Sequence, residues 1–269
     1  MTATPLETSG ADCAVDQCIR YDYSQPVRNV RQRLVVVPPR RHGRQHRIEW
    51  SVDVRGADAE IMRSARDTFG NLRIDIAVPK VRSWIEFDVR ATIAFRDDQK
   101  VAAVRPDLRY SRPTRLTAPD DAIALLLTGC DRTDPDPICA RVHEALTYEH
   151  GITDVHTTAA DALAGSRGVC QDYAHLMLAA CRLVGMPARY VSGHLIGEGG
   201  SHAWVEVLRQ DDDNPGTWMA EAWDPTNCRR TDDSYITIAT GRDYADVAPM
   251  SGTFDGRAHG RLTVSKRAR

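Results

Sequence analysis

The stretch GVCQDYAHLMLAACRLVGMP, Gly168–Pro187, decides how the fold is interpreted, because its pattern predicts a helix that is apolar on nearly every side. Its apolar residues recur at spacings of three and four, the period of a helix face. They are Tyr173, Ala174, Leu176, Met177, Leu178, Ala180, Cys181, Leu183 and Val184. A helix of this kind lies buried at the centre of a domain. Gly185 and Pro187 mark its expected end.

A cysteine stands at the start of this buried helix. Cys170 falls in the first turn, where free backbone N–H groups and the positive end of the helix dipole favour a thiolate over a thiol. A thiolate is a nucleophile, and the same N–H groups can receive the negative oxygen of a tetrahedral intermediate. Cys181 lies about three turns deeper and has neither advantage, so we interpret it as a core residue.

A candidate base and its partner lie downstream in a predicted β-hairpin. SHAWVEVLR, Ser201–Arg209, alternates as a strand, and TWMAEAWDP, Thr217–Pro225, forms a second strand after a loop of turn residues. A hairpin centred on Asp213 places His202 directly opposite Asp224, whereas a slip of one residue would put them on opposite faces. A carboxylate beside an imidazole fixes its tautomer and stabilises its cation. The sequence therefore predicts Cys170 as nucleophile, His202 as base and Asp224 as orienter.

Three neighbours have a functional and a structural interpretation that the sequence leaves open. Gln171 could frame an oxyanion site through its backbone N–H, or only suit the first turn of the helix. Trp204 shares the predicted face of His202 and could shield it from water, or simply pack in the core. Asn227 could support Asp224, or form only a local turn in DPTN.

The motifs resemble the bacterial transglutaminase-like cysteine protease family of the papain-like superfamily. The resemblance rests on 167–195 with its Cys motif, on SHAWVEV, AWDPTN and GRDYADVAPMSG, and it runs from about Tyr148 to about Gly256. It implies a Cys-His-Asp triad and acyl transfer through a thioester. The sequence departs from the family where Ser234 and Tyr235 stand in place of a frequent histidine.

The first half of the chain has the pattern of an antiparallel β-structure. Short segments rich in Val, Ile and aromatic residues alternate with polar residues between Pro, Gly and Asp. They are 18–24, 31–38, 46–54, 71–79 and 83–95. YDYSQPVRNVRQRLVVVPP, Tyr21–Pro39, also resembles the β-rich domain that often precedes the family's core. A proline-rich segment, 105–121, is the expected linker.

We therefore expect an α+β protein of two domains. Residues 1–112 form an antiparallel β-sandwich-like domain, and residues 113–269 form a papain-like or transglutaminase-like core in which the helix bearing the cysteine packs on an antiparallel sheet. Three shorter helices precede that helix, one capped by Asp136 with Pro137 in its first turn and one capped by Thr157 or Thr158.

Composition and charge exclude several classes of function. The net charge of −2 favours neither nucleic acid nor a membrane surface, and no apolar run is long enough to span a bilayer. Residues 19–115 carry 21 Lys and Arg against 12 Asp and Glu, whereas residues 116–269 carry 14 against 22. This asymmetry fits a basic domain docked on an acidic one, or charged faces that are simply solvated, better than it fits a basic platform for an acidic substrate.

The seven cysteines include no CxxC pair, which argues against a disulfide framework or a structural zinc site. We expect no cofactor and no metal. The first residues lack the features of a secretory signal, so the cytoplasm is the expected location. The sequence does not predict the oligomeric state.

The predicted reaction is acyl transfer at an amide or ester carbonyl of a protein, peptide or small amide. Hydrolysis of the peptidase or amidase type is favoured, because water needs no second binding site. Transamidation, with an amine as acceptor, shares every step up to the thioester. A non-catalytic binding protein on the same fold is the alternative from another class.

Overall fold

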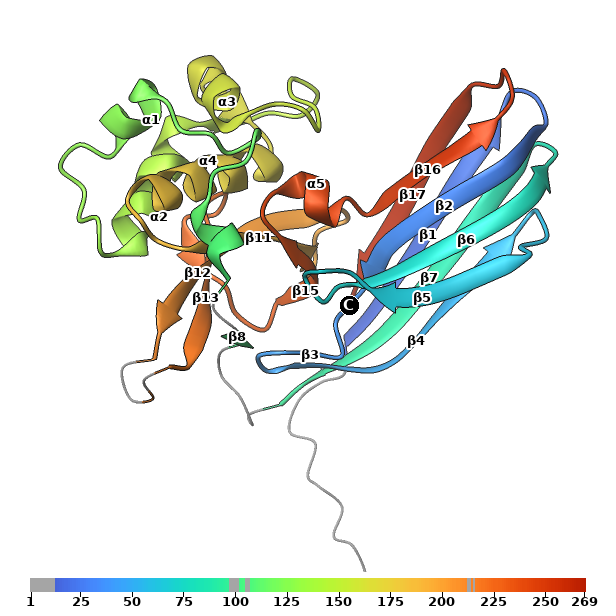
Figure 1. The fold of residues 1–269 in the computed structure, drawn as a ribbon, viewed down its shortest axis with the longest axis horizontal. Helices are drawn as coiled ribbons and strands as arrows, with labels where there is room; N and C mark the ends of the chain where they lie inside the picture. The colour runs from blue at the N-terminus through green and yellow to red at the C-terminus, as the bar shows by residue number, and fades with distance from the viewer. Residues whose placement is uncertain (1–12, 97–101, 105–106, 212–213, 215) are drawn as a thin grey trace, which may run out of the picture.

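The computed structural model describes residues 13–96, 102–104, 107–211, 214 and 216–269, and it shows two units joined side by side (Figure 1). The first unit is a sandwich of two antiparallel sheets, here called the sandwich. One sheet has the order β17 (Gly260–Ala268), β1 (Cys13–Tyr23), β7 (Trp84–Phe95), β4 (Gln45–Arg55) and β3 (Arg41–His42). The other has the order β16 (Met250–Asp255), β2 (Val27–Val37), β6 (Leu72–Val81) and β5 (Ile61–Arg66).

Strict alternation explains why these segments form two facing sheets. In β6 the side chains of Ile74, Ile76 and Val78 are buried, while the residues between them are partly exposed. In β7 the residues Ile85, Phe87 and Val89 repeat the pattern. The inward faces of both sheets supply one apolar core.

In the second unit, here called the helical unit, the helices pack against an antiparallel sheet whose strands differ in length. The sheet has the order β14 (Arg229–Arg230), β13 (Trp218–Asp224), β12 (His202–Gln210), β11 (Ala188–Leu195) and β15 (Tyr235–Gly241), and β8 (Ala102–Val104) also pairs with β13. The helices are η1 (Leu108–Ser111), α1 (Asp121–Leu126), α2 (Pro135–Ala145), α3 (Ala159–Gly165), α4 (Cys170–Leu183) and α5 (Tyr244–Val247). Two short parallel strands, β9 (Thr147–Tyr148) and β10 (Arg167–Gly168), precede α4.

Helix α4 lies at the centre of the helical unit, as its apolar pattern predicts. Every residue from Gln171 to Arg182 is buried. The helix packs on β11 and β12 and contacts α1, α2 and α3. The predicted α+β class, with a β-sandwich followed by a cysteine-bearing helix on an antiparallel sheet, is confirmed. No helix of the described residues has the length and apolarity needed to cross a bilayer.

The end of the chain returns to the sandwich, which the predicted boundary of the second domain, 113–269, did not anticipate. Strand β16 pairs with β2, and strand β17 pairs with β1 from Val15↔Ala268 to Tyr23↔Gly260. The helical unit therefore stands between two parts of the sandwich in the sequence.

The hairpin of β12 and β13 has a different register from the predicted one. The structure pairs Val205 with Trp223 and Gln210 with Trp218, so His202 is not directly opposite Asp224. The reason is that Gln210 belongs to the strand, while the Asp211 N–H closes the loop by donating a hydrogen bond of 2.8 Å to the Thr217 carbonyl. The predicted centre, Asp213, lies outside the described residues. The shift preserves the side of the sheet on which each residue lies, because that alternation has a period of two.

A second expectation that was wrong concerns the start of α2. The sequence offers Asp134-Pro135 and Asp136-Pro137 in tandem, and the prediction used the second pair. In the structure Asp134 is the N-cap, accepting a hydrogen bond of 3.0 Å from the Asp136 backbone N–H, and Pro135 is the first helical residue. For α3, Thr158 is the cap, one of the two predicted residues.

Side-chain amides of the sandwich cover the outer edge of β15. The Gln45 amide donates to the Thr237 carbonyl at 2.9 Å and accepts from the Thr237 N–H at 2.8 Å. Asn71 makes the same reciprocal pair with Thr240, at 2.9 Å in each direction. Both amides thus imitate a neighbouring strand, so the sandwich fixes the edge strand of the other unit.

A buried ion group joins the two units at a second point. Glu206 on β12 accepts from Arg189 at 2.6 Å and contacts His42 of β3 at 2.5 Å. Burial opposes the charge of Glu206, but Arg189 and His42 outweigh it and lower the pKa of Glu206 to about 2. The carboxylate therefore stabilises the fold above its ordinary pKa of 4.5 and loses that contribution as the pH falls toward 2.

We expect Glu206→Gln to lower the free energy of unfolding at pH 7 by about 3 kcal/mol, because Arg189 then keeps a buried charge without its carboxylate. The variant should also lose less stability than the wild type as the pH falls from 4.5 to 2. Urea unfolding followed by tryptophan fluorescence measures both effects. The exposed pair of Glu149 and Arg167 is the control, and Glu149→Gln should change stability by less than about 0.5 kcal/mol. Equal effects of the two substitutions would contradict the role given to Glu206.

Candidate functional site

The first turn of α4 is fixed by a carboxylate, and this sets the position of Cys170. The Asp172 side chain accepts hydrogen bonds from the Val169 N–H at 2.8 Å and from the Thr153 hydroxyl at 2.7 Å. The half-buried Cys170 is the first residue of the helix. Its own N–H and that of Gln171 are among the groups for which a helix start provides no intrahelical acceptor.

Gly168 permits this arrangement by leaving room for Asp172. A Cβ atom at Gly168 would lie 2.6 Å from the Cβ of Asp172 and 2.8 Å from its Oδ2. Asp172 is fully buried, and burial raises its pKa. The hydrogen bonds from Val169 and Thr153 act in the opposite direction but do not outweigh burial. The glycine at this position is therefore a packing requirement of the first turn.

The structure brings the side chains of His202 and Asp224 together despite the shifted register. His202 begins β12 and Asp224 ends β13, and His202 Nε2 lies 2.7 Å from Asp224 Oδ2. Both side chains are buried. Cys170 also acts on His202, because a hydrogen bond with Cys170 and its charge are among the causes that raise the pKa of the imidazole. The structure thus brings His202 and Asp224 into direct contact, and Cys170 acts on the same imidazole.

Charge on His202 is stabilised from both sides. Burial disfavours the imidazolium, but the hydrogen bonds with Asp224 and Cys170 and their negative charge outweigh burial and raise the pKa of His202 to about 10. For Asp224, burial disfavours the carboxylate, and hydrogen bonds from His202, Tyr235 and Asn227 nevertheless lower its pKa. The arrangement favours an imidazolium at His202 at neutral pH.

Asp224 is held by more groups than His202. Its Oδ2 accepts from the Asn227 amide and from the Tyr235 hydroxyl, each at 2.7 Å. Its Oδ1 accepts from the backbone N–H of Thr226 at 2.9 Å and of Asn227 at 3.2 Å. Asn227 therefore supports Asp224 through its side chain and also belongs to the turn that follows β13. The functional and the structural interpretation of this residue both apply.

Gln171 and Trp204 occupy different places at the site. The Gln171 amide donates to the Asp154 carbonyl at 3.0 Å, which leaves its backbone N–H as the group next to the thiol. Trp204 is buried and stacks on His202, with ring centroids 6.2 Å apart. Trp204 also meets Tyr235 edge-on at 5.3 Å, so it forms a wall behind the imidazole.

Sequence reasoning missed three residues at this site. Tyr235 on β15 accepts a hydrogen bond of 2.9 Å from Arg229, whose guanidinium lies over its ring. A polar chain from Arg229 through Tyr235 thus reaches Asp224. The one signal was that Tyr235 stands where the resembling family often has a histidine. Glu198, in the loop between β11 and β12, lies 3.9 Å from His202 Nδ1 and is half exposed.

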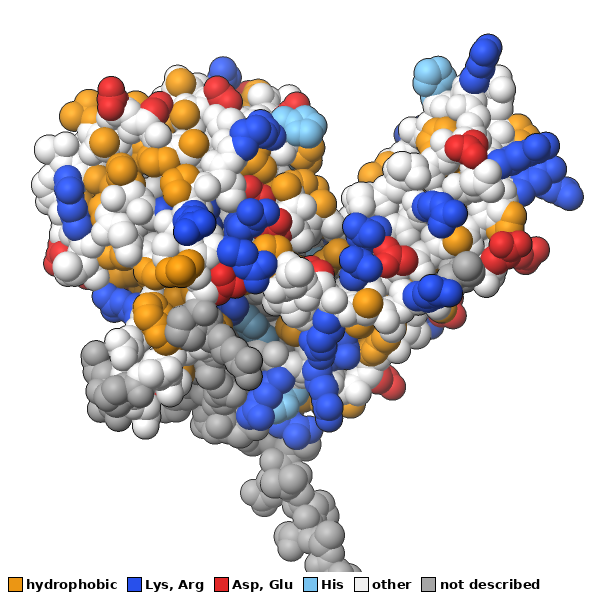
Figure 2. All heavy atoms as spheres, viewed as in Figure 1, with side chains coloured by type: hydrophobic (Ala, Val, Ile, Leu, Met, Phe, Trp, Pro, Cys, Tyr) orange, Lys and Arg blue, Asp and Glu red, His pale blue; other side chains and the backbone are white. Residues whose placement is uncertain are grey.

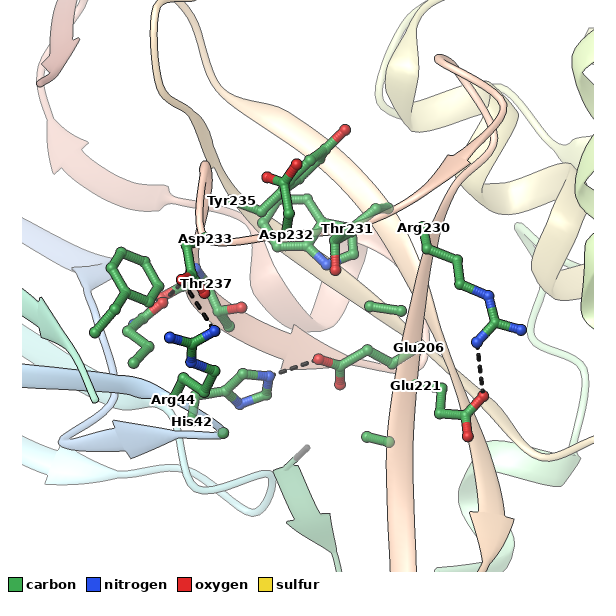
Figure 3. Close-up of a pocket in the computed structure, with 16 residues that line it drawn as sticks. His42, Arg44, Glu206, Glu221, Arg230, Thr231, Asp232, Asp233, Tyr235 and Thr237 are labelled. Atoms are coloured by element: carbon green, nitrogen blue, oxygen red, sulfur yellow. Dashed lines mark hydrogen bonds and ion pairs between the residues drawn. The ribbon is translucent and has the colours of Figure 1, made fainter. Parts of the chain in front are cut away.

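A pocket of about 350 Å³ lies behind the site, at the junction of the two units (Figure 3). Trp204, Glu206 and Tyr235 contribute to its wall. Ion pairs join His42 to Glu206, Arg44 to Asp233 and Arg230 to Glu221, and the first two of these pairs cross the junction. These charged groups therefore take part in holding the sandwich against the sheet.

Metal-ligating side chains gather at one place outside this site among the described residues. Cys18, Glu86 and Asp88 lie on the sandwich with ligand atoms within 4.8 Å of one another. Arg55 pairs with both carboxylates of this group, which balances its charge.

We expect Gly168→Ala to destabilise the protein by about 1–3 kcal/mol, because the added methyl group overlaps Asp172 and must displace the first turn of α4. Thermal or urea unfolding measures the loss. Gly165→Ala is the matched control, since it lies at the end of α3 with open space around its Cβ position. If both alanines have the same effect, the close approach does not constrain the turn.

We expect Asp224→Asn to lower the pKa of His202, because the substitution removes the carboxylate that stabilises the imidazolium. NMR of histidine-labelled protein should show the wild-type ring losing its proton as the pH rises toward about 10, and the variant ring losing it at a lower pH. His175 provides an internal reference, since burial lowers its pKa to about 4. An unchanged His202 titration would refute the coupling to Asp224.

Comparison with known proteins gives matches in both units. Residues 13–94 match the family described as bacterial transglutaminase-like N-terminal region, and residues 131–221 match the transglutaminase-like superfamily. The second match includes Cys170 and His202 and ends before Asp224.

The similar sequences belong to proteins of mycobacteria. An uncharacterised protein of Mycobacterium leprae is 43% identical over 131 residues, which are 44% of this chain and 43% of that protein. An uncharacterised protein of Mycobacterium tuberculosis is 37% identical over 126 residues, which are 43% of this chain and 40% of that protein. The matched region thus spans less than half the length of each relative.

A solved structure resembles nearly the whole chain. It is a candidate cysteine protease from Cytophaga hutchinsonii, with a TM-score of 0.75, 21% identity, and coverage of 97% of this chain and 91% of that one. At this identity the likeness concerns the fold.

Proposed function

We propose that the protein transfers acyl groups through a thioester on Cys170. The chain belongs to the transglutaminase-like superfamily, a cysteine-dependent catalytic family, and it carries a bacterial transglutaminase-like N-terminal region. The observation that carries the proposal is the buried pair of His202 and Asp224, 2.7 Å apart, whose imidazole also interacts with Cys170 at the first turn of α4. In this proposal Cys170 is the nucleophile, His202 the base and acid, and Asp224 the orienter.

In the first half of the reaction the Cys170 sulfur attacks the carbonyl carbon of an amide or ester. The carbonyl electrons move to oxygen, and the backbone N–H groups of Cys170 and Gln171 supply the hydrogen bonds for that negative charge. The tetrahedral intermediate then expels the amine or alcohol, which takes its proton from the His202 imidazolium. The acyl group remains on Cys170 as a thioester.

In the second half an acceptor attacks the thioester. When the acceptor is water, His202 removes its proton, the carboxylic acid leaves and the thiol is restored. We favour this hydrolysis of a protein, peptide or small amide, because water needs no second binding site. An amine acceptor follows the same steps and yields an amide. The half-exposed carboxylate of Glu198 beside His202 favours this second candidate function, since it would attract a cationic amine.

Trapping of the acyl-enzyme tests the proposal. We expect a p-nitrophenyl ester of an N-acyl amino acid to release a burst of one p-nitrophenol per protein molecule, and mass spectrometry to find the acyl group on Cys170. His202→Ala should retain the adduct longer, since water then lacks its base, and Cys170→Ser should abolish the burst. The exposed Cys228 is the internal control for acylation without a site.

Addition of a primary amine decides between the two reactions. Formation of the free acid despite excess amine supports hydrolysis, and formation of the amide supports transfer. If the ester acylates Cys228 as readily as Cys170, or if Cys170→Ser leaves turnover unchanged, the catalytic proposal fails. Binding without turnover would instead favour a non-catalytic binding protein on this fold.

We further propose a reducing compartment, the cytoplasm, as the location. The proposal rests on the seven cysteines of the sequence, which include no CxxC pair and give no disulfide framework of the kind found in secreted domains. Mass spectrometry of the protein alkylated in cell extracts measures the fraction of each thiol that is reduced.

A further inference from the structure

The outer face of the sheet formed by β16, β2, β6 and β5 carries a hollow of about 550 Å³, which is lined only by residues of these four strands. Three arginines contribute to its wall, Arg31 and Arg33 from β2 and Arg63 from β5, and all three are exposed. Ala77 and Ser251 beside them have short side chains, so the space between the guanidinium groups stays open.

The strand register brings these arginines to one face. Across the sheet Ser251 pairs with Arg33, Arg33 with Asp75, and Asp75 with Arg63. Residues directly opposite each other on neighbouring strands point to the same side of a sheet. Arg31 lies two residues from Arg33 on β2, so its side chain is on that side as well. The arginines therefore surround a single hollow.

The carboxylate of Asp75 lies at the centre of this face and balances only part of its charge. Asp75 accepts hydrogen bonds from Arg33 Nε at 2.9 Å and from Arg73 Nε at 2.8 Å. Among the residues that the structure describes, Arg31 and Arg63 have no carboxylate partner. Their guanidinium groups remain available to an anion from outside, and the planar guanidinium is suited to a carboxylate in particular.

The charge of the surrounding unit favours an anionic partner. The excess of basic residues over residues 19–115, 21 Lys and Arg against 12 Asp and Glu, does not by itself define a site. Figure 2 shows Lys and Arg side chains gathered along the sandwich and around its junction with the helical unit. A surface of one sign raises the local concentration of ligands of the other sign. The hollow is the place on the sheet where guanidinium groups without a carboxylate converge on such a ligand.

The spacing of the arginines favours an extended peptide. An antiparallel strand rises about 3.4 Å per residue, so Arg31 and Arg33 repeat at about 7 Å. A peptide extended along β2 has the same repeat, and acidic residues at its alternate positions would face both arginines.

Nucleic acid fits this face less well. Among the described residues that line the hollow, none has an aromatic side chain on which a base could stack. Residues 116–269 carry 22 acidic against 14 basic residues and would repel a long polyanion.

We infer that this hollow binds an extended acidic segment of a partner protein, in which Asp or Glu alternates with other residues. The carboxylates of the segment pair with Arg31 and Arg63 and compete with Asp75 for Arg33. The sandwich thereby acquires a binding role of its own. The inference does not involve Cys170, so it stands or fails separately from the proposed function.

Binding of a labelled peptide to the full chain tests the inference. The probe is a fluorescein-labelled ten-residue peptide in which Glu alternates with Thr, and fluorescence anisotropy measures its Kd. The buffer contains 0.1 M NaCl, at which charges more than about 10 Å away are largely screened. We expect Arg31→Gln and Arg63→Gln each to weaken binding about threefold, and the double variant about tenfold. Arg261→Gln, which removes an exposed arginine of β17 in the other sheet, should change Kd by less than about 1.5-fold.

Asp75→Asn should change the affinity in the opposite direction. It removes the carboxylate that occupies Arg33 and Arg73, so binding should become about threefold tighter. Asp22→Asn is the matched control, because Asp22 pairs with Arg20 at 2.9 Å in the other sheet and its loss changes the net charge equally. A gain of affinity does not arise from a damaged fold, and thermal unfolding verifies that the arginine variants remain folded.

Four results would overturn the inference. The first is that the Glu-Thr peptide does not bind, and the second is that a Gln-Thr peptide binds as tightly, so that charge is not recognised. The third is an equal loss in Arg31→Gln and Arg261→Gln, which indicates an effect of net charge alone. The fourth is tighter binding of an oligothymidylate of equal charge, which identifies the partner as a nucleic acid. None of these results affects the proposed function, which is tested by acylation of Cys170.

Discussion

Asp224 carries a negative charge in a position without solvent, and the arrangement of three separate segments depends on keeping that charge satisfied. The end of β13 supplies the carboxylate, the following turn supplies Asn227, and β15 supplies Tyr235. A buried carboxylate with several donors is rigid, because each donor that moved away would leave an acceptor unpaired. His202 therefore receives a fixed partner, and that partner sets the orientation of its ring.

The sandwich contributes to this rigidity through the edge of the second sheet. Gln45 and Asn71 supply hydrogen bonds to β15 on the side where no strand follows. Since Tyr235 begins β15, the docking of the sandwich is connected to the position of Asp224 through one short strand. The ion group at Glu206 anchors β12 in the same way. The two units are thus coupled mechanically through the sheet that holds the candidate site.

The sequence allowed the helix and the candidate residues to be predicted because both depend on local periodicity. Cys170 is recognisable because an apolar helix begins at that residue. The side of the sheet on which each residue of β12 and β13 lies follows from alternation alone. That is why an error in the register left His202 and Asp224 within contact. Tyr235 and Arg229 could not be assigned, because their roles arise from contacts between segments. The exposed strands β16 and β17 have little apolar signal, so their pairing with β1 and β2 was equally invisible.

The return of β16 and β17 makes the helical unit an insertion within the sandwich. Strands β1 and β2 leave the ribosome long before β17 and β16, which pair with one edge of each. Two unpaired edges therefore persist during most of synthesis, and such edges are sites for association with other chains. The edges close only when β16 and β17 pair with strands on the far side of the helical unit in the sequence. Pairing between segments so distant along the chain is a slow step. Completion of the sandwich is consequently a late event in the folding of the protein.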